Sequence, residues 1–429
     1  MPSFGNLRTY DHCFCRETLS KTLRKSDFFD MRALHDESVK LSVIDAAVES
    51  ACSLFSGKNP LVRFPLKGNQ VYSLDSLPNE LAVRKLNENI ARLVSIRPPA
   101  RDVIVSNLRH LIGEGVPYRL YRLDIRKFYE SFSTTAVEER IVRLPGLSPP
   151  SKGLLRALLS HYVSLGGTGL PRGLALSALL AEIMMQEFDL AVRSMSGVYF
   201  FSRYVDDIVI MTSSNENPKV FRRDIVRYLP AGLVLHERKR QICSLSDIVT
   251  PIKPSPIVAK ISFDYLGYRF AVYEPAKVAN KKRGQYSRDV VVDIADSKLR
   301  RIKTRVVRSF MDFVATGDFD LMRLRIKFLT SNFRIKDFRR ERSKLSGIYY
   351  SYPEITDPAS IGLRELDKFL ANAVLSKNGR VFSKSSAALT ANQRCLLLKH
   401  SFVRGHQKRL MVHLHPTTIA KIQECWANE

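Results

Sequence analysis

The sequence has few features that would tie it to a zinc site or to an oxidising compartment. It holds one tryptophan and six cysteines in 429 residues, and only Cys13 and Cys15 lie close together along the chain. No CxxC pair and no His/Cys cluster with the spacing of a zinc site is present. We therefore expect reduced thiols and a cytoplasmic location.

Long apolar runs are also absent. No stretch reaches the roughly 18 apolar residues that a helix needs to cross a bilayer, and the opening MPSFGNLRTYDHCFCRE lacks the apolar core of a signal peptide. The sequence thus predicts a soluble protein with no membrane partner.

Acidic residues are few compared with basic ones. The chain has 68 Lys+Arg against 42 Asp+Glu, a formal net charge of +26, together with 45% hydrophobic residues. The apolar content is high enough for a globular core and excludes wholesale disorder. A basic surplus of this size indicates a polyanionic partner, most simply nucleic acid. A merely soluble basic protein is the alternative.

The hydrophobic pattern alternates between helical and strand-like segments. We expect a helical entry, an α+β middle and a basic helical C-terminal third. The predicted hairpins are 61–72 and 198–212, and the predicted single strands are 118–125, 233–237 and 263–270. The predicted helices are 34–48, 80–93, 101–112, 152–164, 174–195 and 218–229, followed by helices from about residue 295 onward.

The sharpest local signal is Tyr204-Val205-Asp206-Asp207 between two apolar arms. Adjacent carboxylates at a hairpin tip repel each other, so this placement favours a bound cation. Asp124 ends the strand predicted upstream and could converge on the same spot, as a pair of Mg²⁺ ions in a polymerase requires. Taken alone, the tetrad is a weak signal, and Asp124 alone is more simply a helix cap.

Five segments occur in an order and spacing that resemble the fingers and palm motifs of reverse transcriptases. They are LDIRKFYESF, GLPRGLALSALLAEI, FSRYVDDIVIM, GLVLHERKR and FDYLGYRF. Further details, including SFxxG near Ser401–Gly405, are most similar to the bacterial antiviral reverse transcriptases of the defence-associated and abortive-infection types. The resemblance implies an α+β right-hand polymerase fold, with an antiparallel palm sheet followed by a helical thumb.

The same resemblance implies a site with two Mg²⁺ ions as cofactors. Asp124 and Asp206 would be the bridging ligands, the Ile125 carbonyl a further ligand, and Asp207 a supporting carboxylate. Lys239 matches the lysine that protonates or screens the leaving pyrophosphate, with a solvated lysine as the alternative.

Other positions would contact the nucleotide. Tyr129 falls where these enzymes hold a steric gate against a ribose 2′-hydroxyl, although a core tyrosine is nearly as well supported. Lys67 and Arg84 could clamp the triphosphate. Arg172 stands where most of the wider family has glutamine, which puts the usual sugar or template contact in doubt, and Gly173 would let the backbone approach the nascent base pair.

The expected domains are an N-terminal helical segment at 1–60, fingers at 61–120, a palm at 121–275, a basic thumb at 276–345 and a C-terminal helical region at 346–429. Residues 281–344 hold 19 Lys/Arg and 8 Asp/Glu. Within them, Arg301, Arg305 and Arg308 follow helical spacing and form one basic stripe that could track a duplex backbone.

These observations predict an RNA-directed DNA polymerase, a nucleotidyltransferase that adds dNTPs to a 3′-hydroxyl. The expected partners are an RNA template, most simply a structured noncoding RNA used in antiphage defence, and the DNA product. Template-independent or protein-primed synthesis and a catalytically silent RNA-binding scaffold remain alternatives. The sequence leaves the template, the primer, the oligomeric state and the trigger of defence open.

Overall fold

The structure is a computed structural model in which the chain forms two compact units. It describes residues 11–66, 68–96, 99–246, 258–274, 287–337, 342–357, 360–376, 378–379 and 381–427. The described residues of unit 1 come from 1–98 and 119–242, and those of unit 2 from 99–118, 243–337 and 342–429. Within the described ranges, no helix is long and apolar enough to span a bilayer.

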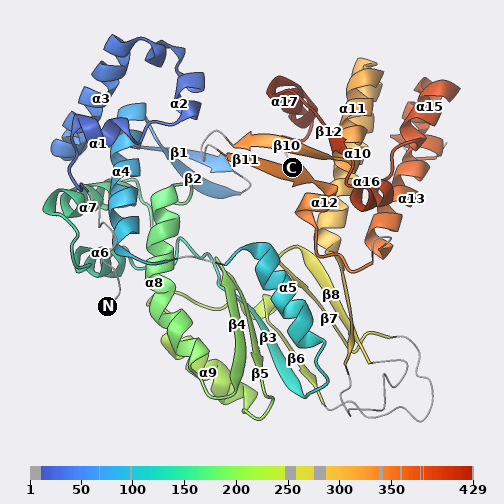
Figure 1. Ribbon diagram of the computed structural model, residues 1–429, viewed down its shortest axis with the longest axis horizontal. Coiled ribbons are helices and arrows are strands. Elements are labelled where there is room, and N and C mark those ends of the chain that lie inside the picture. The colour runs from blue at the N-terminus through green and yellow to red at the C-terminus, as the bar shows by residue number, and fades with distance from the viewer. Residues whose placement is uncertain are drawn as a thin grey trace, which may run out of the picture. The chain divides into compact units, whose positions relative to one another are not determined.

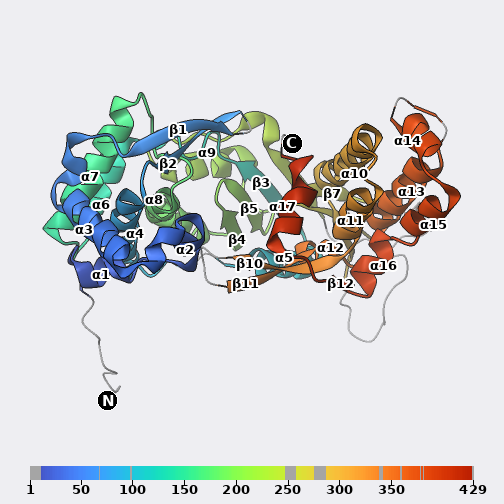
Figure 2. The ribbon, with the colours of Figure 1, turned by 90° about the horizontal axis from the view of Figure 1, so that it is seen from above.

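Unit 1 begins with helices that pack around α4 and α8 (Figure 2). The predicted hairpin is confirmed as two antiparallel strands, β1 and β2. The elements of this part are α1 (Arg16–Ser20), α2 (Lys25–Asp30), η1 (Arg32–His35), α3 (Glu37–Cys52), η2 (Leu54–Gly57), β1 (Leu61–Leu66), β2 (Asn69–Leu74), α4 (Leu77–Leu93), α6 (Thr134–Val142), α7 (Pro149–Ser164) and α8 (Ala175–Arg193).

A four-stranded sheet carries the predicted carboxylates. Its strands are β3 (Tyr118–Asp124), β4 (Val198–Tyr204), β5 (Asp207–Thr212) and β6 (Gln241–Leu245), in the order β4-β5-β3-β6 (Figure 1). The apolar run of β5 is buried in the middle of the sheet, as expected of a covered strand. Helix α9 (Pro218–Tyr228) packs on the sheet, with the rings of Tyr121 and Phe221 4.8 Å apart.

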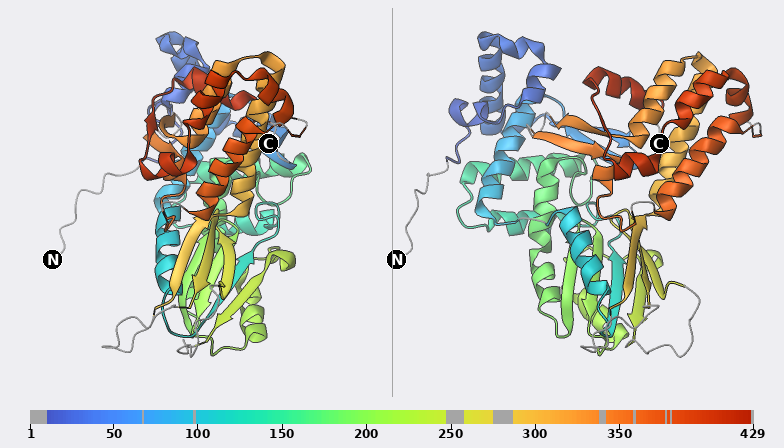
Figure 3. Two further views of the ribbon diagram at one scale, coloured as in Figure 1. Left: turned by 90° about the vertical axis from the view of Figure 1, so that its right-hand side faces the viewer. Right: turned by 45° about the vertical axis from the view of Figure 1, so that its right-hand side comes forward.

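Unit 2 combines two small sheets with a group of helices in which α10 contacts α11 and α13 (Figure 3). One sheet has the order β7-β8-β9 and the other β11-β10-β12. The elements are α5 (Arg101–Ile112), β7 (Ile261–Tyr265), β8 (Tyr268–Tyr273), β9 (Asp289–Ile294), α10 (Asp296–Thr316), α11 (Phe319–Thr330), β10 (Asn332–Asp337), β11 (Arg342–Gly347), α12 (Ile348–Ser351), α13 (Ile361–Leu375), α14 (Phe382–Ala388), α15 (Ala391–Leu398), α16 (Phe402–Gln407), β12 (Met411–Val412) and α17 (Pro416–Glu424).

Three secondary-structure predictions need correction. Residues 233–237 form no strand, because they pair with the end of β3 only through the bridge between Ile125 and Leu235 before the 3-10 helix η3 (Glu237–Lys239) begins. The stretch 263–270 spans the turn between β7 and β8. The C-terminal third is not wholly helical, because β10 pairs with β11 and with the distant β12. Strands that form by such long-range pairing in a basic segment show little alternation of apolar and polar residues, so the sequence pattern does not predict them.

The SFxxG motif has a packing role in unit 2. Ser401 caps α16 by accepting a hydrogen bond from the Arg404 amide, and its hydroxyl donates to Asp367. Phe402 is fully buried, and a Cβ on Gly405 would lie 1.7 Å from the carbonyl oxygen of Thr330. The motif therefore docks α16 against the end of α11, where only glycine fits.

Candidate active site

The two-residue turn between β4 and β5 is strained. Tyr204 pairs with Asp207, and Val205 between them has φ +60°, whereas Asp206 is absent from the described residues with positive φ. A positive φ at the first turn position only is the pattern of a type II′ turn, which normally takes glycine. A β-branched residue there costs on the order of 1–3 kcal/mol and points to a functional constraint.

Asp124 lies directly across from this turn. The register of β3 and β5 places Asp124 opposite Asp207, and like charges directly opposite in a sheet destabilise it. The amide of Ile125 donates to the carbonyl oxygen of Asp206 at 3.0 Å, and the amide of His236 donates to that of Asp124 at 2.7 Å. Three distant segments of unit 1 therefore converge at one end of the sheet, as the sequence predicts.

Lys239 is the principal cation at this point. Its ammonium Nζ donates to both carboxylate oxygens of Asp124, at 3.0 and 2.9 Å. The Asp124 side chain is 7% exposed, but that of Lys239 is 53% exposed. An exposed lysine on a flexible stem can leave the carboxylate without disturbing the core. Lys239 thus marks the position where a cation is favoured.

The turn carboxylates are held in an unfavourable environment. Burial raises the pKa of Asp206, and repulsion from Asp124 adds to the shift. Burial also raises the pKa of Asp207, with Asp206 and Asp124 adding and Arg122 opposing. The Arg122 guanidinium lies 3.9 Å from the Asp207 carboxylate. Carboxylates that are buried beside one another favour a cation bound from solution.

The residues present fit magnesium rather than a metal caged by protein alone. Across the parts of the chain that the structure describes, no group of three or more His, Cys, Asp or Glu side chains is arranged to hold a metal by itself. Mg²⁺ is usually held by one or two carboxylates that are completed by waters and substrate phosphates. Asp124 and Asp206, with the Ile125 carbonyl beside them, supply a donor set of that kind.

Tyr129 lies beside this end of the sheet in a half-buried position. Burial raises its pKa, and the charges of Glu182 and Asp206 add to the shift. The guanidinium of Arg172 lies 5.3 Å from the centre of the Tyr129 ring and pairs with Glu130 at 2.7 and 3.0 Å. This arginine therefore orders the surroundings of the tyrosine instead of extending freely into solvent.

Gly173 holds the neighbouring loop close to β2. Its φ is +113°, and a Cβ there would lie 2.5 Å from the carbonyl oxygen of Tyr72. The Tyr72 amide donates to the carbonyl oxygen of Arg172 at 2.7 Å. The structure therefore explains the glycine by backbone packing within unit 1.

One of the two predicted triphosphate contacts, Arg84, does not join the site. Lys67 lies outside the described residues. Arg84 is a structural residue instead, because its side chain is 9% exposed and its guanidinium binds Asp27 at 2.6 Å and Glu80 at 2.6 Å. It also donates to the carbonyl oxygen of Thr22. With its donors engaged by these groups, Arg84 is not available to a nucleotide.

The sequence pattern does not predict two sets of ion pairs near the turn. Arg203 pairs with Glu182 and Asp189 of α8, and Glu130 holds Arg172. A signal was present in α8, because residues seven apart lie on one helix face. The arginine that Glu182 and Asp189 bind could not be read from that spacing.

The basic stripe lies on α10 in unit 2. Arg301 is exposed, while Arg305 and Arg308 are half-buried. The Arg305 guanidinium lies 5.2 Å from the centre of the Trp426 ring, whose Nε1 donates to the Arg305 carbonyl oxygen. Arg305 therefore has a packing role in addition to any contact with nucleic acid.

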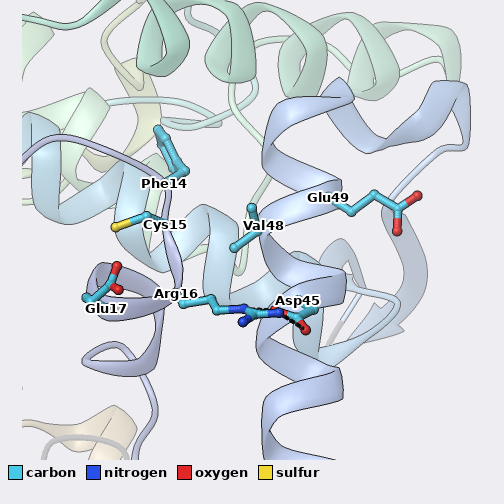
Figure 4. Close-up of a pocket in the computed structure, with 7 residues that line it drawn as sticks. All are labelled: Phe14, Cys15, Arg16, Glu17, Asp45, Val48 and Glu49. Carbon is cyan, nitrogen blue, oxygen red and sulfur yellow. Dashed lines mark hydrogen bonds and ion pairs between the residues drawn. The ribbon is translucent and has the colours of Figure 1, made fainter.

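A separate depression lies between the segment around α1 and helix α3 (Figure 4). Phe14 and Val48 supply apolar lining, and Arg16 forms an exposed ion pair with Asp45 across it. None of the predicted site residues lines this depression. It carries no part of the proposed chemistry.

Part of the chain matches a known protein family. Residues 101–270 match the family model described as "Reverse transcriptase (RNA-dependent DNA polymerase)". No curated protein matches the chain. A solved structure of apo telomerase from Candida tropicalis, truncated from the C-terminal domain, is similar with 12% sequence identity and a TM-score of 0.31, over 50% of this chain and 53% of that one.

The chain thus spans about half the length of that telomerase structure. Residues 101–270 therefore resemble a reverse transcriptase domain, and the match covers less than half of the chain. The predicted α+β polymerase fold with an antiparallel sheet is confirmed.

Proposed function

We propose that this chain is an RNA-directed DNA polymerase that adds dNTPs to a 3′-hydroxyl at the end of the β3–β5 pair. The observation that carries the proposal is the convergence of Asp124 with the Asp206-Asp207 turn. Burial raises the pKa of Asp206 and of Asp207, and repulsion from the neighbouring carboxylates adds to both shifts. All three carboxylates are present, which argues against a silent RNA-binding scaffold.

Asp124, Asp206 and the Ile125 carbonyl would hold two Mg²⁺ ions, with Asp207 supporting the pair. Such ions lower the pKa of the attacking hydroxyl and stabilise charge on the leaving pyrophosphate. Lys239, now paired with Asp124, would move to the leaving group and donate a proton or screen its charge. Its exposed stem allows that movement.

Tyr129 would select the sugar of the incoming nucleotide. Its ring is held against Arg172, which Glu130 fixes in turn, so a 2′-hydroxyl would meet a rigid surface. Tyr129→Val should lower the preference for dNTPs over rNTPs by about 10- to 100-fold, whereas Tyr129→Phe should keep it. If both variants lose dNTP and rNTP incorporation in equal proportion, Tyr129 is a packing residue.

The deciding experiment is primer extension with dNTPs and Mg²⁺ on an RNA template, a DNA template and no template. Wild-type protein should extend on RNA, and Asp124→Asn, which keeps the side-chain volume, should not. Extension of equal rate by wild type and Asp124→Asn would contradict the proposed site. Extension without any template, or product attached to the protein, would favour the untemplated or protein-primed alternative.

The RNA partner would lie along the stripe of α10. Residues 281–344 have 19 Lys/Arg against 8 Asp/Glu, and each phosphate contact contributes about 0.7–0.9 to the log–log slope of affinity against salt. Reversing Arg301 and Arg308 to glutamate should weaken RNA binding and flatten that slope. Arg305 is left intact because it packs on Trp426. An unchanged slope would place the RNA elsewhere.

A structured noncoding RNA used in antiphage defence is the template that the motif resemblance favours. RNA that copurifies with the protein would be sequenced, and cells that express wild type or Asp124→Asn would be challenged with phage. One enriched RNA species, with protection that depends on Asp124, is the expected result. Random RNA and equal phage growth would contradict the defence role.

A further inference from the structure

Arg203 lies in β4 directly before the strained turn, and its side chain is 3% exposed. Two carboxylates of α8 clamp its guanidinium. Nε and Nη2 donate to Asp189, both at 2.8 Å, while Nη1 and Nη2 donate to Glu182 at 3.0 and 2.7 Å. A buried arginine held by two bidentate partners has one fixed orientation.

The remaining donor of Arg203 reaches the turn itself. Nη1 donates to the carbonyl oxygen of Val205 at 3.1 Å. All five N–H groups of the guanidinium are then in use. Val205 is the β-branched residue with φ +60°, and a residue in that region persists only where its surroundings fix it.

We propose that Arg203 is a positioning residue, which Glu182 and Asp189 orient so that its bond to Val205 holds the turn in the form that presents Asp206 to Asp124. The proposal rests on the function proposed above. The proposal connects two separate sequence motifs. Glu182 ends GLPRGLALSALLAE, and Arg203 directly precedes YVDD.

The same helix also carries the loop beside Tyr129. The hydroxyl of Ser177 in the first turn of α8 donates to the Pro171 carbonyl oxygen at 2.7 Å, and Leu170 donates its amide to the Tyr129 carbonyl oxygen at 2.8 Å. Helix α8 therefore links the surroundings of the gate residue to the metal-binding turn. Arg203 joins α8 to the turn, because it pairs with two carboxylates of α8 and donates to the Val205 carbonyl oxygen.

Lysine cannot replace this arginine, because it offers three donors from one point and no planar fork. Arg203→Lys and Glu182→Gln are the informative variants, since they keep most of the buried volume. Arg119→Met and Glu216→Gln are the matched controls, because Arg119 pairs with Glu216 at 2.7 Å at the opposite end of the same strands.

The experiment measures primer extension across a Mg²⁺ series, together with amide hydrogen exchange of a peptide that contains residues 204–207. Arg203→Lys and Glu182→Gln should lower kcat at least 10-fold and raise the Mg²⁺ concentration for half-maximal rate, with little change in KM for dNTP. Exchange at 204–207 should accelerate without Mg²⁺. The controls should change thermal stability but neither Mg²⁺ dependence nor this exchange.

Unchanged Mg²⁺ dependence and unchanged exchange in a folded Arg203→Lys protein would overturn the proposal while wild type still extends primers. If wild type itself does not extend primers, the proposed function fails and the exchange comparison alone decides. Faster exchange at 204–207 in the two variants, but not in the controls, would then still support the positioning role.

Discussion

The two ends of the β3–β5 strand pair carry buried charge in opposite ways. At the end where β3 begins, Arg119 and the Tyr121 hydroxyl both donate to Oε1 of Glu216, at 2.7 and 2.6 Å. Burial alone would raise the pKa of Glu216, but hydrogen bonds from Tyr121, the backbone, Thr212 and Arg119 hold it below its ordinary value. At this end the Glu216 charge is therefore paired within the protein.

At the end where β3 stops, negative charge exceeds positive charge. Among the charged side chains that interact there, the carboxylates are Asp124, Asp206, Asp207, Glu182, Asp189 and Glu130, and the cations are Lys239, Arg122, Arg203 and Arg172. The pKa values of Asp206 and Asp207 are raised there, through burial first and mutual repulsion second. The sheet thus pairs the carboxylate at one end and leaves an excess of negative charge at the other end, where a ligand is expected.

The largest expected contrast between the ends is catalytic. Asp206→Asn removes a ligand charge and should lower DNA synthesis on the order of 10³-fold or more. Glu216→Gln should stay within about 3-fold, because Glu216 pairs with Arg119 at the opposite end of the strands from the turn carboxylates. Single-turnover primer extension measures both. Equal losses in the two variants would show that the turn end acts through stability alone.

Replacement of Lys239 should lower the rate of DNA synthesis less than replacement of Asp206. Lys239→Met should slow the chemical step by about 10²-fold, the usual scale for a positioned proton donor. It should also let Mn²⁺ bind more tightly without nucleotide, because the ammonium no longer occupies Asp124. Mn²⁺ titration followed by electron paramagnetic resonance tests this. Weaker Mn²⁺ binding would mean that Lys239 helps to build the site instead of competing for it.

Asp206→Asn and Glu216→Gln should change the free energy of unfolding in opposite directions. Asp206→Asn relieves burial and repulsion of a charge, so we expect the free energy of unfolding in chelator to rise by about 0.5–1 kcal/mol. Glu216→Gln breaks a mostly buried pair and should cost about 1–2 kcal/mol. Urea unfolding checks both. A loss in the Asp206 variant would show that its carboxylate makes a stabilising contact.

The smallest expected effect is on the pH dependence of folding stability. Since the pKa of Glu216 is lowered on folding, its charge stabilises the fold above its unfolded pKa of about 4.3, and that contribution is lost as the pH falls through the folded value. Glu216→Gln should therefore make stability in chelator less dependent on pH below about 5. Urea midpoints from pH 7 to pH 4 would show a flatter profile. A steeper profile would contradict the conclusion that folding lowers the pKa of Glu216.

The sequence was sufficient for the local features of this protein. The apolar arms around Asp206 predicted a hairpin, and β4 and β5 form it. The resemblance to reverse transcriptases places Tyr129, five residues after Asp124, where a steric gate is expected, and Tyr129 does lie near the carboxylates, since Asp206 acts on its pKa. Its role as a gate stays a prediction. Short-range patterns of this kind survive folding because adjacent residues must share a strand or a turn.

Only the tertiary structure decided which charges meet. The sequence predicts a triphosphate contact at Arg84, yet this residue is buried against Asp27, 57 residues away. Arg203 meets Glu182 and Asp189 from 21 and 14 residues away, and β10 meets β12 across more than seventy positions. The sequence by itself determined that carboxylates end β3 and occupy the turn before β5, whereas packing determined which cations neutralise them, because an ion pair depends on distance in space and not along the chain.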